Sequence, residues 1–104
     1  NYYEMVFEVT RQIPHGRIST YGAIADYLAL GSARMVGWAL NNCGGQGVPA
    51  HRVVNRKGEL SGRNHFPTPT MMQDLLEQEG VKVEDDKVMD FMKLCWHPEE
   101  LNGD

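Results

Sequence analysis

Cysteine is scarce in this chain of 104 residues, and a long apolar run is absent. Cys43 and Cys95 are too few for a disulfide framework and lack the paired spacing of a zinc site, and the four histidines show no ligand spacing. No run of about 18 apolar residues could cross a membrane, and the start of the sequence lacks the pattern of a signal peptide. We therefore expect one domain over 1–104 without metal, cofactor or membrane contact. The expected compartment is the cytoplasm, at the nucleoid in a bacterium, or the nucleus in a eukaryote.

Positive charge is in the minority, since the net charge is −4, and that balance alone argues against a nucleic-acid partner. The charges are unevenly placed along the chain, however. Residues 10–64 hold seven Lys and Arg against two acidic residues, whereas residues 65–104 hold three Lys against ten acidic residues. A basic segment followed by an acidic one is typical of a domain that presents one face to phosphate, although chance asymmetry on a solvated surface gives the same pattern.

Helical patterns dominate the first half of the sequence. Apolar residues at helical spacing predict a helix over about 2–12, which Pro14 and Gly16 end. The stretch "RISTYGAIADYLAL" predicts a second helix, capped by Ser19 or Thr20 and ended by Gly31. A third helix, "ARMVGWALNN", follows at once with Ser32 as its cap. The short connection makes the last two helices a helix-turn-helix, with the third as the reading helix.

The second half mixes loops, hairpins and one helix. "NCGGQGVP" is a glycine-rich loop, and "HRVVNRKGELSG" suggests a short hairpin around a Lys57-Gly58 turn. A hairpin with Asp85-Asp86 at its tip is expected near the end, and the last residues, about 95–104, are expected to be partly loose although Trp96 should dock. The fold class predicted is therefore mainly α, a small winged helix-turn-helix-like domain with short hairpins.

One further helix is predicted between the two hairpins, in "PTPTMMQDLLEQEG". Thr70 and Gln73 have the spacing of a capping box, Leu75 and Leu76 should face inward, and Gly80 should end the helix.

The outer surface of the third helix is unusual. Ala33 and Gly37 lie four residues apart and form a strip of small residues, with Arg34 beside it. Such a strip allows a close approach to a DNA minor groove, where one long cationic side chain could enter the base stack. The alternative is that the small residues permit tight helix packing and that Arg34 is an ordinary surface charge.

Four segments in register carry a resemblance to a known family. "IPHGRISTYGAIA", "SARMVGWAL", "VPAHRVVNRKGELSG" and "LLEQEG" together resemble the DNA-binding domain of the O6-alkylguanine-DNA alkyltransferases, from about residue 3 to residue 83. In that family a Cys between Pro and His-Arg accepts the alkyl group, and the His and a distant Glu activate it. The resemblance places Ala50 at the acceptor position, His51 as the base and Glu79 as its partner. A methyl side chain cannot accept an alkyl group, so we expect no enzyme activity.

A subgroup, the alkyltransferase-like proteins, resembles this pattern more closely because its members carry Trp or Ala in place of the acceptor Cys. Those proteins bind alkylated DNA, flip the damaged guanine into the former active site and pass the lesion to nucleotide-excision repair. The resemblance implies that Tyr21 crowds the phosphate of the flipped nucleotide, that Arg34 fills the vacated stack and that Arg63 lies against the flipped base. The residues expected to bind DNA are Thr20, Tyr21, Ala33, Arg34, Gly37 and Arg52. Those expected in the damaged-base pocket are Tyr21, Val48, Pro49, Ala50, Arg63 and Asn64.

The leading hypothesis is a monomeric, non-enzymatic sensor of O6-alkylguanine in double-stranded DNA, with nucleotide-excision repair proteins as further partners and with room for O6 groups larger than methyl. One alternative is an active alkyltransferase whose acceptor Cys was replaced by design, against which Arg63 argues because true transferases often carry a Tyr there. Another is a helix-turn-helix regulator that reads the major groove. That regulator needs polar side chains that hydrogen-bond to base edges. The third helix instead carries small or apolar residues at Ala33, Met35, Gly37 and Trp38, which argues against this alternative.

Overall fold

The first helix has the length that the sequence predicts. In the computed structural model, which describes residues 1–101, helix α1 covers Tyr2–Arg11. The Asn1 side chain caps it by accepting a hydrogen bond from the backbone N–H of Tyr3. Its buried side includes Val6 and Phe7, which pack onto the helices that follow.

The next two helices form the expected helix-turn-helix. Helices α2 (Tyr21–Tyr27) and α3 (Ala33–Leu40) begin at Thr20 and Ser32, whose hydroxyl groups each accept a hydrogen bond from a backbone N–H in the first turn. Helix α2 is shorter than predicted because Ala29 adopts a positive φ of 57° and turns the chain before Gly31 is reached.

The expected hairpin around Lys57-Gly58 is wrong in its pairing. Strand β2 (Val53–Val54) runs parallel to β1 (Ser19–Thr20), and the turn at Lys57-Gly58 instead leads into a bridge between Glu59 and Lys87. Two-residue strands carry no readable alternation, so the sequence gives no sign of this partner. The pairing also divides the interior, because consecutive residues of a strand face opposite sides and Val53 and Val54 enter two different cores.

Helix α4 covers Met71–Gln78 and begins at Thr70, but the predicted capping box is wrong. The Thr70 side chain makes no cap hydrogen bond and lies 3.3 Å from a carboxylate oxygen of Asp74 instead. Gly80 ends the helix with a φ of +88°, as expected. Of the two leucines, Leu76 is fully buried whereas Leu75 faces the cavity described below.

The second hairpin is confirmed. Strands β3 (Val83–Glu84) and β4 (Lys87–Val88) pair antiparallel, and the two Asp residues between them both have positive φ, as a two-residue hairpin turn requires.

Hydrogen bonds join the C-terminal segment around Trp96 to Arg17 and Ile18. After α5 (Phe91–Leu94) the chain pairs with Ile18, and Trp96 is only 4% exposed. The backbone N–H of Trp96 donates to the Ile18 carbonyl at 2.6 Å, and the Arg17 guanidinium donates to two carbonyls of the same segment. The expected docking of Trp96 is confirmed, whereas the looseness expected over about 95–104 stays a prediction, and residues 102–104 lie outside the described part. Three short 3-10 helices complete the elements: η1 (Ala50–Arg52), η2 (Arg63–His65) and η3 (Pro98–Leu101).

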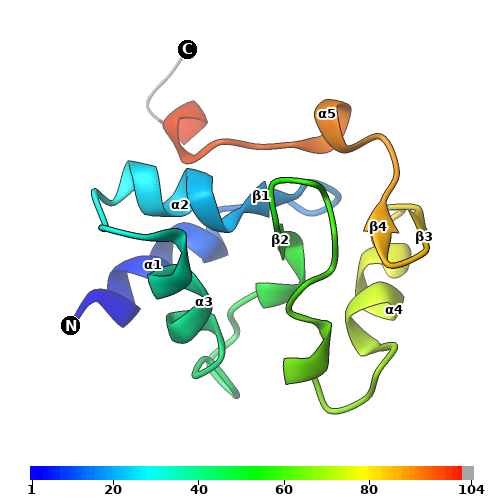
Figure 1. Cartoon of the computed structure of the whole chain (residues 1–104), viewed down its shortest axis with the longest axis horizontal. Coiled ribbons are helices and arrows are strands. Elements are labelled where there is room, and N and C mark those ends of the chain that lie inside the picture. Colours follow the sequence, from blue (N-terminus) through cyan, green and yellow to red (C-terminus); the bar gives the residue numbers. More distant parts are fainter. Residues whose placement is uncertain (102–104) are drawn as a thin grey trace.

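Two apolar clusters lie on either side of the β1–β2 pair. Figure 1 shows the three N-terminal helices on one side, α4 and the β3–β4 hairpin on the other, and the C-terminal segment crossing along one edge. Helices α1, α2 and α3 with Val53 and Trp96 enclose the first cluster, and α4 with Val54 and Leu60 encloses the second. Within residues 1–101 no helix has the length and apolar character needed to span a membrane.

Candidate DNA interface and base pocket

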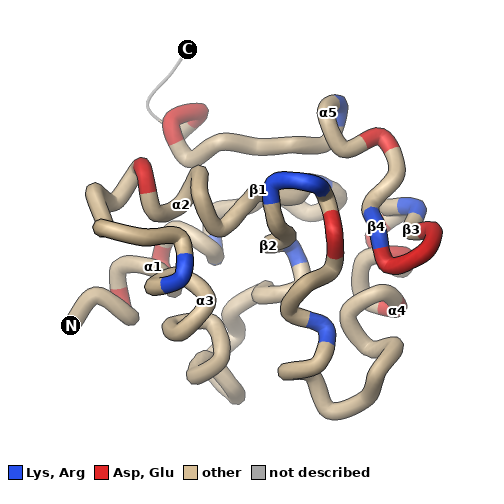
Figure 2. Tube along the Cα trace, viewed as in Figure 1, with Lys and Arg blue, Asp and Glu red and all other residues tan. Residues whose placement is uncertain are grey.

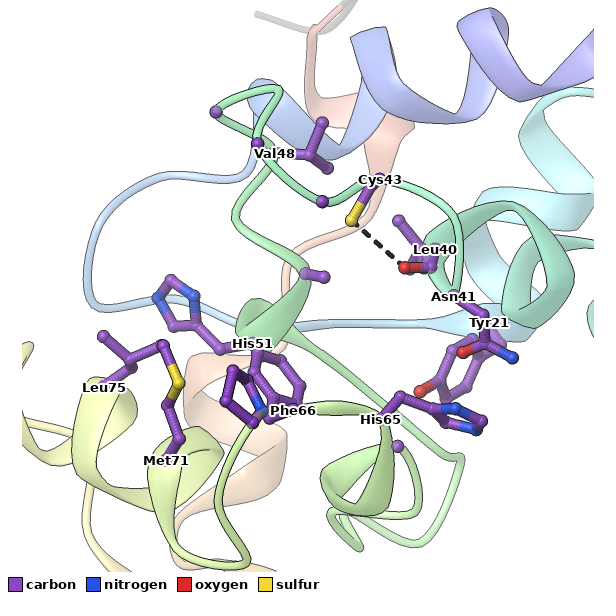
Figure 3. A pocket seen from close by; sticks show the side chains of 16 residues that line it. Tyr21, Leu40, Asn41, Cys43, Val48, His51, His65, Phe66, Met71 and Leu75 are labelled. Atoms are coloured by element: carbon purple, nitrogen blue, oxygen red, sulfur yellow. Dashed lines mark hydrogen bonds between the residues drawn. The ribbon is translucent and has the colours of Figure 1, made fainter.

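A central cavity of about 380 Å³ lies between the glycine-rich loop, η1, η2 and the start of α4 (Figure 3). The loop that walls it is tied to α1 by a hydrogen bond from the Arg11 guanidinium to the Gln46 carbonyl, 3.0 Å long. Of the residues predicted for a base pocket, three line the cavity: Tyr21, Val48 and Ala50. The other lining residues are Leu40, Asn41, Cys43, Gly44, Gly45, Gly47, His51, Gly62, His65, Phe66, Pro67, Met71 and Leu75.

Below this cavity a buried carboxylate collects hydrogen bonds from three parts of the chain. Glu79 accepts from His51 Nε2 at 2.7 Å, from the Gly16 backbone N–H at 2.8 Å and from the Arg52 guanidinium at 2.9 to 3.1 Å. We call Glu79, His51, Arg52 and the Gly16 N–H the Glu79 cluster. Burial alone would raise the pKa of the Glu79 carboxyl, but the hydrogen bonds from Arg52, Gly16 and His51 outweigh it and lower that pKa to about 2. The carboxylate is therefore ionised at neutral pH.

Ala50 and His51 sit side by side at the start of η1 and both line the cavity. A carboxylate that accepts from one ring nitrogen orients the imidazole and leaves the other nitrogen free to accept a proton. Such a pair could take a proton from a thiol, but the Ala50 methyl offers none. Cys43 also lines the cavity, yet its thiol donates to the Leu40 carbonyl and burial raises its pKa, which favours the unreactive protonated form.

Three predicted site residues do not reach the cavity wall. Arg63 donates from a guanidinium nitrogen to the Leu60 carbonyl at 2.9 Å and lies 3.5 Å from a carboxylate oxygen of Asp86, so it faces the β3–β4 hairpin. Pro49 precedes η1 and Asn64 is exposed on η2, and neither is among the lining residues. The structure therefore does not bring the predicted set together as a whole.

Sequence reasoning missed most of the aromatic and apolar wall of this cavity. Phe66, Met71 and Leu75 lie near His51 on one side of the cavity, whereas His65 lies near Tyr21 on the other side (Figure 3). The loop from η2 to α4 carries no periodicity, so nothing in the sequence shows which of its residues turn inward. Leu75 was expected in the core. Helical spacing shows that Leu75 lies on the apolar side of its helix, but it does not show whether that side faces packed side chains or a cavity.

The outer face of α3 borders a second hollow, about 370 Å³ in volume, which we call the helix groove. Ala33 and Arg34 are exposed on it, and a Cβ added to Gly37 would meet nothing within 4 Å, so the small strip is open to a partner rather than packed. Thr20 caps α2 at one end of this surface. Arg52, in contrast, is not on it, because Arg52 is held inside the Glu79 cluster with its side chain 16% exposed.

Tyr21 stands where three hollows meet. It lines the central cavity, the helix groove and a third groove of about 510 Å³ between the helix-turn-helix and the loop that carries Arg56 and Lys57. Its hydroxyl lies so close to Gly62 that a Cβ there would come within 2.7 Å of it. Burial raises the pKa of Tyr21, so the hydroxyl stays neutral and able to donate a hydrogen bond.

Basic residues border the helix groove and the third groove, where Glu59 is the acidic lining residue among those described. Figure 2 shows basic residues at the start of α3 and on the loop after β2, and acidic residues at the β3–β4 hairpin and η3. The uneven charge of the sequence therefore becomes an uneven surface. Within residues 1–101 no group of three His, Cys, Asp or Glu residues could hold a metal ion.

Comparisons with known proteins identify the family. Residues 1–81 match the family described as 6-O-methylguanine DNA methyltransferase, DNA binding domain. Alkyltransferase-like protein 1 of Schizosaccharomyces pombe is 39% identical over 84 residues, 79% of this chain and 78% of that protein. The DNA base-flipping protein of Vibrio parahaemolyticus is 38% identical over 97 residues, 89% of this chain and 93% of that protein.

A solved structure agrees with these sequence matches. The crystal structure of S. pombe Atl1 in complex with damaged DNA containing O6-carboxymethylguanine superposes with a TM-score of 0.83 at 33% identity, covering 93% of this chain and 95% of that one. The sequence and the fold of this chain therefore both match the alkyltransferase-like proteins. The chain has a helix-turn-helix with an exposed strip of small residues, and a cavity that His51, hydrogen-bonded to Glu79, helps to line. The chain belongs to the family of the 6-O-methylguanine DNA methyltransferase DNA-binding domain, among its alkyltransferase-like members.

Proposed function

We propose that this protein binds double-stranded DNA through the outer face of α3 and recognises O6-alkylguanine by flipping it into the central cavity, without removing the alkyl group. The observation that carries the proposal is the position of Ala50, whose methyl lies in the cavity wall beside the His51–Glu79 hydrogen bond. The likeness to proteins named for base flipping and to a structure bound to damaged DNA supports it.

The residues divide the work of flipping as follows. Ala33 and Gly37 let the α3 backbone approach the minor groove, and the Arg34 guanidinium takes the place that the damaged base leaves. Tyr21, at the meeting point of the three hollows, crowds the phosphate of the moving nucleotide. Extrusion costs a few kcal/mol and is least costly for a weakened pair, so damaged pairs are favoured before any pocket contact forms.

The cavity suits a base that carries an O6 substituent. Its volume of about 380 Å³ lies within the range of small-molecule pockets, and Phe66, Met71 and Leu75 give it an apolar wall. A methyl at position 50 leaves more room than a thiol would, so we propose that O6 groups larger than methyl are accepted. Because a bound lesion stays unrepaired, we further propose that the complex, with one protein molecule per lesion, is handed to nucleotide-excision repair proteins.

The test is a titration of one duplex that carries a single O6-methylguanine against the same duplex undamaged, at fixed salt, followed by mass spectrometry of the protein. We expect tighter binding to the damaged duplex and an unchanged protein mass. A mass gain of one methyl group would contradict the absence of transfer, because another residue would then be the acceptor. Equal binding to both duplexes would contradict lesion recognition.

A cysteine at position 50 tests whether His51 and Glu79 still form an active pair. In Ala50→Cys we expect slow alkyl transfer from O6-methylguanine DNA, since the new thiol would lie next to His51. Ala50→Ser is the matched control, because its hydroxyl is similar in size and far less nucleophilic. Mass spectrometry after incubation measures the transfer. Normal lesion binding by Ala50→Cys without any mass gain would mean that the pair no longer activates a nucleophile.

A further inference from the structure

The two tryptophans of the chain lie in opposite environments. Trp96 is 4% exposed and belongs to the first apolar cluster, whereas Trp38 is 50% exposed on the outer face of α3. Helix α3 is already anchored on its inner side by Val36 and Ala39, both fully buried. Trp38 is therefore not required to hold the helix in place. A single exposed aromatic residue is common on protein surfaces, so its meaning depends on what surrounds it.

Trp38 lines the helix groove together with Arg34 and His65. It follows Arg34 by four residues, and side chains at that spacing lie on the same face of a helix. The helix groove also shares four of its residues with the central cavity: Tyr21, Asn41, Gly62 and His65. The helix groove therefore adjoins the central cavity, so that a nucleotide whose base occupies the cavity can have its neighbour in the strand at this groove.

We propose that the helix groove is a second nucleotide subsite, in which the Trp38 indole stacks on the nucleotide adjacent to the flipped one. This inference depends on the proposed function and specifies it further. Arg34 fills the vacated stack itself, and the flat indole, one helical turn further along α3, stacks on the part of the adjacent nucleotide that the distortion of the DNA exposes. Stacking on an aromatic ring does not require a particular base, so this contact stabilises the distorted DNA in any sequence context.

The charge around the groove favours DNA over a protein as the occupant. Arg34 borders the helix groove, and the neighbouring groove beyond Ala33 is lined by two basic residues and one acidic residue: Arg56, Lys57 and Glu59. Among residues 1–101, those that line the helix groove include no Asp or Glu, so nothing there repels a phosphate. An exposed Trp that served only a protein partner would leave the affinity for DNA unchanged when it is replaced.

The test compares Trp38→Ala and Trp38→Phe with the unaltered protein, titrated with a duplex containing one O6-methylguanine and with the undamaged duplex. We expect Trp38→Ala to weaken binding to the damaged duplex about tenfold or more, as loss of one base–aromatic stack does, and to change binding to the undamaged duplex less than twofold. Trp38→Phe should retain most of the affinity. Met5→Ala, which removes another half-exposed apolar side chain away from the groove, should bind like the unaltered protein.

Tryptophan fluorescence gives an independent readout. Binding of the damaged duplex should quench the unaltered protein strongly, whereas Trp38→Phe, which keeps only the buried Trp96, should show little change. If Trp38→Ala binds the damaged duplex as tightly as the unaltered protein, or weakens both duplexes equally, the inference is overturned. If the unaltered protein itself does not prefer the damaged duplex, the proposed function fails first, so the two failures are distinguishable.

Discussion

The Glu79 cluster and the outer face of α3 each contain an arginine, but its charge is used differently in the two places. In the cluster, the Glu79 side chain is 8% exposed and the Arg52 side chain is 16% exposed. The two side chains hydrogen-bond to each other and to backbone groups. On α3, Arg34 is exposed, and in the described part of the chain its guanidinium makes no hydrogen bond or ion pair. The comparison teaches that a basic residue near a DNA interface is available to DNA only if the fold does not already use it. Replacements in the cluster should therefore lower stability, and replacements on the outer face should lower binding alone.

Removal of the Glu79 carboxylate should have the largest effect. Glu79→Ala leaves the Arg52 guanidinium buried without its anion, and His51 and the Gly16 N–H without their acceptor. Breaking a buried pair in this way costs about 3 kcal/mol or more, so the free energy of unfolding in urea should fall by that amount. Glu77→Ala on the exposed side of the same helix is the control and should change it by less than about 0.5 kcal/mol. Equal, small losses in both variants would mean that the cluster does not hold the fold together.

The stabilisation by the Glu79 carboxylate should also be visible in the pH dependence of stability. The folded-state pKa of Glu79 is lowered to about 2 from an ordinary value of 4.5, so its stabilisation is fully present above pH 4.5 and disappears as the pH falls toward 2. We expect the urea midpoint of the unaltered protein to decline over this window. Glu79→Gln cannot titrate and should decline less. Identical pH profiles for the two proteins would show that other carboxyl groups cause the decline.

Arg34→Ala should separate binding from stability. The variant leaves the vacated base stack unfilled, and we expect a loss of affinity for O6-methylguanine DNA of about 30-fold, since unstacking is worth a few kcal/mol. Arg56→Ala removes an exposed charge on the neighbouring loop whose phosphate contact is partly redundant, so it should cost much less. Both variants should unfold like the unaltered protein. Equal losses of affinity would remove the special role of Arg34 at the base stack.

The smallest effect is expected where Arg63 meets the β3–β4 hairpin. Asp86→Asn removes the carboxylate that lies 3.5 Å from the Arg63 guanidinium, and because both side chains are well exposed the stability should fall by less than about 1 kcal/mol. If Arg63 serves the flipped base, its release should raise the affinity for damaged DNA about twofold, beyond the effect of Asp85→Asn, which removes the same charge from the neighbouring turn residue. Equal affinities in the two variants would indicate that Asp86 does not compete for Arg63.

The sequence predicts the helices of this protein better than its strands. Helices α1 and α3 follow from apolar spacing, and α3 also from its Ser32 cap, which are local signals. The parallel pairing of β1 with β2 joins residues 34 positions apart over only two residues each, and so short a contact leaves no pattern. The hairpin tip at Asp85-Asp86 was predictable because a two-residue turn is itself local.

Some residues of the candidate site could also be predicted from the sequence, whereas their hydrogen-bond partners could not. Tyr21, Val48 and Ala50, which the resemblance implies for a base pocket, line one cavity, and their contact with a base stays a prediction. The resemblance could not show that Arg52 is bound internally or that Arg63 turns to Asp86, because a motif names a residue without giving its hydrogen-bond partners. The apolar wall from Phe66 to Leu75 comes from an irregular loop and one helix turn, where only the packed chain decides which side chains face inward.

The pairing of Ile18 with the segment around Trp96 has a consequence for the order of folding. Arg17 and its carbonyl partner in that segment are 77 residues apart in sequence, so this contact closes a loop that spans most of the chain. Contacts of such separation are slow to form. During synthesis the three N-terminal helices emerge first, yet their apolar cluster lacks Trp96 until residues 94–96 leave the ribosome. Helix α3 therefore reaches its final support only after Trp96 has been synthesised.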